Sequence, residues 1–195
     1  MNDRIAQIDA IVAQFDINNH PFYQEWAAGT LPNAKLQDYA GEYGRFIGTI
    51  ARGWETIGEP AIAEEERDHE VLWGDFRYEL GLKAESRRAQ TDVLVNAATQ
   101  YFGEPAEALG ALYAFEAQQP RTSEAKLEGL KTHYKEITDK GREYFRIHAA
   151  DFAEPEMLRA KMAEMTDSDF ARTKSACTVV CAAMWSALDG VYYAD

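Results

Sequence analysis

Apolar side chains recur every three or four residues along almost the whole chain, which is the period of an amphipathic α-helix. The first such stripe consists of Ile5, Ile8, Val12 and Phe15. Prolines predict the starts of four later helices, at Pro21, Pro32, Pro60 and Pro120. Three more helices are predicted over about 86–101, 104–118 and 139–153. A final helix carries Phe170, Cys177, Met184 and Val191 on one stripe. No stretch alternates apolar and polar residues as a strand would. The pattern predicts an all-α helical bundle of about eight to ten helices, forming a single domain over residues 1–195.

The segment EEERDH, residues 64–69, brings charged side chains next to an apolar stripe. A helix turns about 100° per residue, which places His69 on the apolar face. Glu65 lies about 40° from His69 in projection and Glu66 about 60° to the other side, so both can flank it. Glu64 lies about 140° away and is expected in solvent.

Two later helices also place ionisable side chains on apolar faces. Glu116 shares a face with Leu109 and Leu112, and a buried carboxylate is costly unless it is paired, protonated or bound to a metal. His148 lies among aromatic residues, and Asp151 follows it by three positions on the same side.

Carboxylates and imidazoles on facing helices are the means by which helical bundles hold pairs of iron or manganese ions. This mixture of ligands suits iron or manganese better than copper or structural zinc. We therefore expect two non-haem metal ions, iron and/or manganese, with O2 and an external reductant as the other reactants. Taken one at a time, the same patterns also fit a hydrogen-bonded core histidine, a solvated helix start, and a glutamate paired with a basic residue.

Longer stretches resemble a known family. HPFYQEWAAGTLPNAKLQDYAGEY, and LYAFEAQQPRTSEAKLEGLKTHY followed by YFRIH, are similar to segments of the haem-oxygenase-like dimetal oxidases. That group includes TenA-type proteins, pyrroloquinoline-quinone synthase and the CADD-like para-aminobenzoate synthases, which the chain resembles most. The resemblance covers roughly residues 15–155 and implies a haem-oxygenase-like bundle.

The resemblance also implies an unusual reaction, in which the enzyme converts its own side chains into para-aminobenzoate for folate synthesis. Tyr23 matches the tyrosine that supplies the ring, and Lys126 the lysine that supplies the nitrogen. Tyr144 matches a tyrosine near the site, and the matching metal ligands are His69, Glu116 and His148. Without the resemblance, Tyr23 would be interpreted as a packed core aromatic and Lys126 as a surface lysine.

The chain departs from the family at the first glutamate. In the family, the histidine lies seven residues after that glutamate because of an insertion between them. This chain lacks the insertion. Glu65, four residues before His69, returns to nearly the same helix face. Undecene-forming relatives use a Glu-x-x-His step, which favours Glu66, so the choice stays open.

A second departure follows His148. The family has aspartate four residues later and histidine seven residues later, where this chain has Phe152 and Pro155. Asp151 can still reach the site from three residues away. Glu154 would project about 120° from His148 on a regular helix, so it becomes a ligand only if the helix is distorted. Pro155 favours such a distortion, because it disfavours α-helical geometry at the residue before it.

Three other functions are compatible with these patterns. One is an oxidase of the same fold that acts on a diffusible amino acid or fatty acid. The second is a TenA-like hydrolase, which needs a thiol nucleophile. Cys177 and Cys181 lie four residues apart on a core stripe and are expected to be buried, reduced thiols. The third is a non-catalytic binding protein.

Charge limits the partners. The chain has 33 acidic and 20 basic residues, for a formal net charge of −13, whereas nucleic acids and anionic membranes bind basic surfaces. No apolar run approaches the length of a bilayer span, and the N-terminus lacks a signal-peptide core. We expect a cytoplasmic protein that binds neither nucleic acid nor membrane. The family resemblance implies a homodimer.

Overall fold

The computed structural model describes residues 3–82 and 87–194, which contain eleven α-helices, one short 3-10 helix and no strand. The elements are α1 (Asp3–Gln14), η1 (Ile17–Asn19), α2 (Pro21–Ala28), α3 (Asn33–Ile47), α4 (Ile50–Thr56), α5 (Pro60–Glu79), α6 (Ala89–Tyr101), α7 (Pro105–Glu116), α8 (Gln119–His133), α9 (Asp139–His148), α10 (Ala153–Ala163) and α11 (Asp167–Tyr192). The all-α prediction is confirmed.

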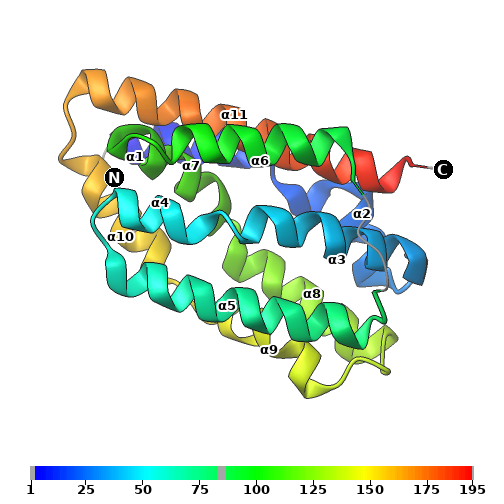
Figure 1. Cartoon of the computed structure of the whole chain (residues 1–195). Coiled ribbons are helices and arrows are strands. Elements are labelled where there is room, and N and C mark those ends of the chain that lie inside the picture. The colour runs from blue at the N-terminus through cyan, green and yellow to red at the C-terminus, as the bar shows by residue number, and fades with distance from the viewer. Residues whose placement is uncertain (1–2, 83–86, 195) are drawn as a thin grey trace.

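Helix α7 forms the centre of the bundle. All of its residues from 108 to 116 are buried, as expected of a helix that is apolar on every side. In Figure 1, α6 and α11 run along one side of the bundle, and α5, α8 and α9 along the other. Helix α3 contacts both sides, α4 packs against α5 and α7, and α7 packs against α11. Glu116, the last residue of α7, is thereby carried into the middle of the molecule.

Several helix starts lie where the prolines predict them. Helix α2 begins at Pro21, and His20 caps it, since its Nδ1 accepts a hydrogen bond of 3.1 Å from the Phe22 backbone N–H. At the other end of the chain, the Thr166 hydroxyl accepts a hydrogen bond from the Asp169 backbone N–H and caps α11.

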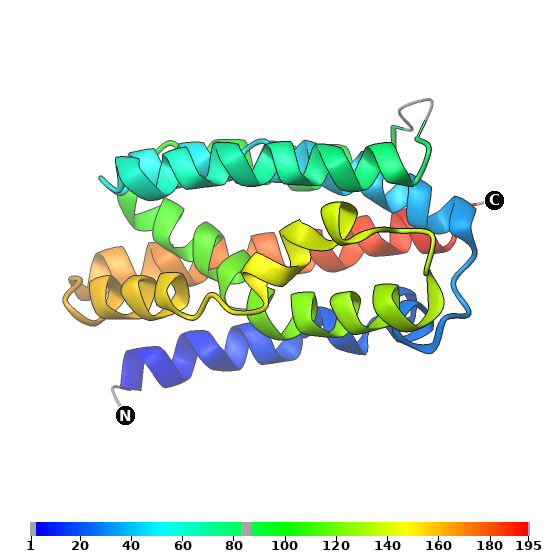
Figure 2. The same cartoon turned by 90° about the horizontal axis from the view of Figure 1, so that it is seen from below.

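The sequence pattern gave the wrong extent for one helix and missed another. The predicted helix over 139–153 ends at His148, and a new helix, α10, begins at Ala153. Figure 2 shows the chain changing direction in the link between α9 and α10. The Asp151 carboxylate stabilises the break by accepting a hydrogen bond of 2.9 Å from the Ala153 backbone N–H. The short helix α4, which was not predicted, follows the end of α3 at Gly48.

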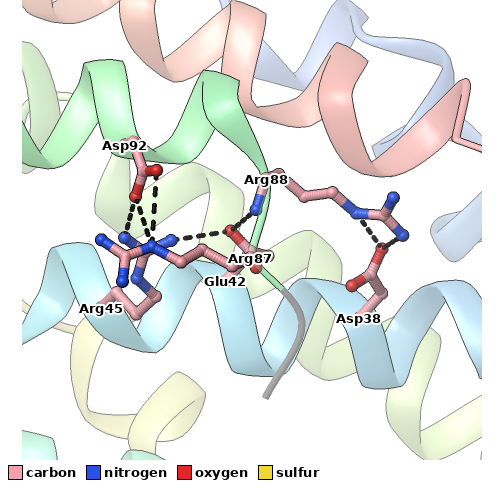
Figure 3. A network of polar contacts seen from close by, with 6 residues as sticks. All are labelled: Asp38, Glu42, Arg45, Arg87, Arg88 and Asp92. Carbon is pink, nitrogen blue, oxygen red and sulfur yellow. Dashed lines mark hydrogen bonds and ion pairs between the residues drawn. The ribbon is translucent and has the colours of Figure 1, made fainter.

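A network of ion pairs joins α3 to the start of α6 (Figure 3). Glu42 on α3 is 1% exposed and accepts hydrogen bonds of 3.1 Å from the Arg45 guanidinium and from the Arg88 backbone N–H. Arg45 also pairs with Asp92 on α6. These hydrogen bonds satisfy the buried carboxylate of Glu42. The network therefore holds α3, which also carries the buried Tyr39 and Tyr43, against the start of α6.

Helix α11 is long and apolar enough to cross a membrane if length and composition alone are considered, with a mean hydropathy of 1.2 over its best window. However, 56% of that window is buried within the bundle, and α11 packs along α6 and α7. The core helix of a soluble protein meets the same criteria of length and composition.

Candidate metal centre

Five ionisable side chains from four helices meet in the core. Glu66 and His69 come from α5, one turn apart, and Glu116 is the last residue of α7. His148 ends α9, and Glu154 lies in the first turn of α10. The exposed fractions are 2% for Glu66, 8% for His69, 1% for Glu116, 1% for His148 and 5% for Glu154. Burying so many ionisable groups together is costly unless they bind a cation.

The five residues form two groups that share Glu66. One donor atom each of Glu66, His69 and His148 lie within 4.8 Å of one another, and so do carboxylate oxygens of Glu66, Glu116 and Glu154. Such spacing allows each group to surround one cation. Because Glu66 belongs to both groups, it would help to hold both ions of a metal pair.

His148 is prepared to act as a ligand. Its Nδ1 lies 2.8 Å from the Tyr144 carbonyl oxygen, so Nδ1 carries the ring proton and donates a hydrogen bond to that oxygen. The Nε2 atom is buried and has no hydrogen-bond partner among the described residues. Burial, assisted by His69, lowers the pKa of His148 to about 3, which keeps the ring neutral. A neutral ring with a free Nε2 lone pair is the form that binds a metal.

His69 contacts both the other histidine and a carboxylate. Its ring centre lies 4.5 Å from that of His148, and its Nδ1 lies 3.1 Å from Oε1 of Glu66. Burial is the largest influence on the pKa of His69 and lowers it, but the hydrogen bond to Glu66 and the negative charges of Glu66, Glu65 and Asp151 together raise the pKa above its usual value. Glu66 thus orients the His69 ring while remaining part of the cluster.

The three carboxylates repel one another. Burial is the largest cause of the raised pKa of Glu116, and the charges of Glu154 and Glu66 raise it further. Burial and the charge of Glu66 raise the pKa of Glu154 to about 8. A divalent cation would remove this repulsion, because it favours the ionised form of every carboxylate. Trp54 donates a hydrogen bond of 3.3 Å to Glu116, which leaves the other carboxylate oxygen available. The donor set therefore fits a pair of iron or manganese ions.

Two predicted candidates lie outside this cluster. Glu65 is exposed on the outer side of α5, and Asp151 caps the start of α10 instead of pointing one oxygen into either group. The structure thus brings Glu66 rather than Glu65 to the histidines. Glu154 joins them because the break between α9 and α10 removes the regular geometry that would have turned it away. Glu64 is in solvent and pairs with Arg67, as the helix geometry predicts.

The resemblance-based residues Tyr23 and Lys126 lie together beside the cluster. Lys126 is only 3% exposed, and its Nζ lies 4.6 Å from the centre of the Tyr23 ring. Nζ donates a hydrogen bond of 3.0 Å to the Tyr39 hydroxyl, which is 2.8 Å from the Tyr23 hydroxyl. Burial lowers the pKa of Lys126 to about 7. The interpretation of Lys126 as a surface lysine is therefore wrong.

Two further tyrosines link this pair to the carboxylates. Burial is the main cause of the raised pKa of Tyr43 and Tyr144, and Tyr23 and Glu116 both add to it, so these two phenols lie near both groups. The Tyr43 hydroxyl is buried and has no hydrogen-bond partner among the described residues. Tyr144 accepts a hydrogen bond of 3.0 Å from Gln119.

Sequence reasoning missed Tyr39, Tyr43 and Trp54 as parts of the site. All three lie on apolar helix faces, where an aromatic ring predicts core packing. The only available signal was that each also carries a buried polar atom that needs a partner.

The two cysteines are buried and unpaired, as predicted. A hydrogen bond to Cys181, together with burial, raises the pKa of the Cys177 thiol well above its usual value. A thiol held in its protonated form is a poor nucleophile, which argues against a thiol-dependent hydrolase.

Sequence comparison decides the family. A family described as an iron-containing redox enzyme, with a haem-oxygenase-like fold, matches residues 54–174, which is more than half of the chain. The chain belongs to this family of haem-oxygenase-like, iron-containing redox enzymes. Residues 6–58 also match the TENA/THI-4/PQQC family. The matched range includes all five residues of the cluster.

Individual proteins are similar to this chain along most of their length. A 4-aminobenzoate synthase from Nitrosomonas europaea is 28% identical, over 95% of this chain and 89% of its own. A 4-aminobenzoate synthase from Chlamydia pneumoniae is 29% identical, over 76% of this chain and 75% of its own. Among solved structures, a TenA homologue from Pseudomonas syringae has a TM-score of 0.81 with 16% identity, covering 99% of this chain and 94% of that one. These comparisons confirm the haem-oxygenase-like fold.

Proposed function

We propose that this protein is an O2-dependent dimetal oxidase that makes para-aminobenzoate from two of its own side chains. Tyr23 would supply the ring and Lys126 the nitrogen. The observation that carries the proposal is the buried contact between them, with the Lys126 amine 4.6 Å from the centre of the Tyr23 ring. The names of the relatives from Nitrosomonas and Chlamydia support the same product.

The metal ions would be iron and/or manganese, held by Glu66, His69, Glu116, His148 and Glu154. When bound and supplied with an external reductant, the metal pair provides the oxidising chemistry with O2. The protein's own contribution is orientation. The Tyr144 carbonyl fixes the proton of His148 on Nδ1, and Trp54 holds one oxygen of Glu116.

The surroundings of Lys126 suit a reacting amine. Five aromatic ring centres lie within 6 Å of its Nζ, those of Tyr23, Trp26, Tyr39, Tyr43 and Phe145. These rings exclude water and destabilise the charged form, so much of the amine is neutral at physiological pH. A neutral amine keeps the lone pair that a new carbon–nitrogen bond requires. The hydrogen bond to Tyr39 positions Nζ beside Tyr23.

The proposal is tested in cells that cannot make para-aminobenzoate. Tyr23→Phe and Lys126→Ala should each reduce rescue of growth at least about 100-fold. The first removes the phenol hydroxyl that makes the Tyr23 ring oxidisable, and the second removes the nitrogen that would enter the product. The controls are Tyr78→Phe on the exposed side of α5 and Lys131→Ala on the exposed side of α8, which should rescue like the unaltered protein. Intact-mass spectrometry after the reaction should show one chain of altered mass for each molecule of product formed. Rescue by both site variants, or many product molecules from chains of unchanged mass, would instead indicate a diffusible substrate.

The single-turnover rate should depend on pH through the Lys126 amine. Its pKa of about 7 means that about 10% of the amine is neutral at pH 6 and about 90% at pH 8. The yield of product in the first seconds should therefore rise several-fold between these pH values and level off above pH 8. Measuring bound metal at each pH separates this effect from metal loss. A rate that is flat from pH 6 to pH 8 with constant metal content would show that the amine does not limit the reaction.

A further inference from the structure

A surface hollow of about 430 Å³ opens beside the metal centre. It lies between α5 and α9 and is lined by Glu65, Asp68, His69, Val71, Leu72 and Ile147. His69 is the member of this lining that also belongs to the ligand cluster. The hollow therefore connects solvent with one of the candidate metal ligands.

The outer part of the hollow is acidic. Glu65 and Asp68 are both exposed on α5, three residues apart, and both line the hollow. The nearby arginines do not neutralise this rim, since Arg67 pairs with Glu55 and Glu64 and Arg146 with Glu143.

The inner end of the hollow leads to an unused donor atom. His69 lines the hollow and is more than nine-tenths buried. Its ring centre lies 4.5 Å from that of His148, whose buried Nε2 has no hydrogen-bond partner among the described residues. A buried imidazole nitrogen without a hydrogen bond is unfavourable as it stands, and a cation would satisfy it.

We propose that this hollow is the entrance through which divalent cations reach the metal centre. Glu65 and Asp68 attract a hydrated cation to the opening, and the cation then exchanges water for His69 and the carboxylates behind it. Glu65 and Asp68 act on the rate of loading and are not ligands of the bound ion. The inference rests on the proposed metal centre and adds the route and the residues that serve it.

The test measures uptake of Mn²⁺ by metal-free full-length protein, with no O2 chemistry involved. Loss of the electron paramagnetic resonance signal of aqueous Mn²⁺ follows binding in time. In low salt, Glu65→Gln/Asp68→Asn should load about tenfold more slowly than the unaltered protein, with the same final number of ions per chain. The difference should shrink at an ionic strength of about 1 M, where exposed charges are screened. The control is Glu70→Gln, which removes one charge from an exposed residue of the same helix that does not line the hollow.

Each outcome bears on a separate statement. Equal loading rates for the double variant and the unaltered protein would overturn the entrance while leaving the metal centre intact. A reduced final number of ions would overturn it too, because Glu65 or Asp68 would then be a ligand. An unaltered protein that takes up no Mn²⁺ and no Fe²⁺ would contradict the proposed oxidase itself.

Discussion

Glu66→Gln should leave the protein almost free of metal, whereas Glu65→Gln should retain the full complement at equilibrium. Glu66 offers a carboxylate oxygen to both groups of the cluster, so its loss weakens both positions at once. Even residues that only orient metal ligands cost 10–100-fold in affinity when they are replaced, and we expect about 100-fold or more for a shared ligand. Glu65 is exposed on the outer side of the same helix.

Metal analysis of both variants, purified from cells grown with iron and manganese, measures this effect. Circular dichroism confirms that each variant is folded, which Glu66→Gln should be because it removes a buried charge and keeps the side-chain volume. Normal metal content in Glu66→Gln combined with loss in Glu65→Gln would reverse the assignment. The pair of variants thus answers the question that the sequence left open.

Gly110→Ala should destabilise the protein by about 3 kcal/mol, which lowers the melting temperature by about 6–12 °C in a chain of this size. A Cβ atom on Gly110 would lie 2.0 Å from the Thr173 carbonyl oxygen and 3.1 Å from the Cys177 backbone nitrogen. These are backbone atoms of α11, so the only relief is to separate α7 from α11. That movement would also displace the end of α7, which carries Glu116.

The matched control for Gly110→Ala is Gly74→Ala on the exposed side of α5. No atom lies within 4 Å of the Cβ position at Gly74, so alanine should stabilise the helix by up to about 1 kcal/mol. Thermal unfolding followed by circular dichroism compares the two. Equal melting temperatures would show that the contact between α7 and α11 yields without cost, and the close approach would then not hold the central helix in place.

Helical periodicity was sufficient to predict an all-α bundle and the inward side of several helices, although it missed α4 and extended α9 too far. It placed Glu64 in solvent and Glu116 in the core, because both positions lie far from the boundary between the faces. It could not choose between Glu65 and Glu66, which lie at similar angles on opposite sides of His69. That choice depends on which side of α5 faces the other ligand-bearing helices, and only tertiary packing determines it.

Other parts of the site depend on local breaks and on long-range contacts. Pro155 predicted an irregular backbone at Glu154, but Glu154 is helical and the break lies before it, between His148 and Ala153. The hydrogen bond from the Ala153 backbone N–H to Asp151 and the new direction of α10 bring Glu154 to the cluster. The burial of Lys126 is invisible in a helix rich in charged residues, and family resemblance alone drew attention to it. Tyr39 escaped notice because its ring satisfies the apolar pattern while its hydroxyl joins Lys126 to Tyr23.

The dense aromatic packing around Tyr23 would affect the lifetime of a chain that had reacted as proposed. Its ring is 95% buried and packs against Phe22, Trp26 and Tyr39 with ring centres 5.5–6.2 Å away. Under the proposed reaction, a spent chain would hold an empty space in place of that ring, and removing a buried aromatic side chain costs about 3–5 kcal/mol. Such a loss is a large part of the stability of an ordinary domain. Spent chains would then unfold more often and be cleared by proteases, so that the supply of product would follow the rate of protein synthesis.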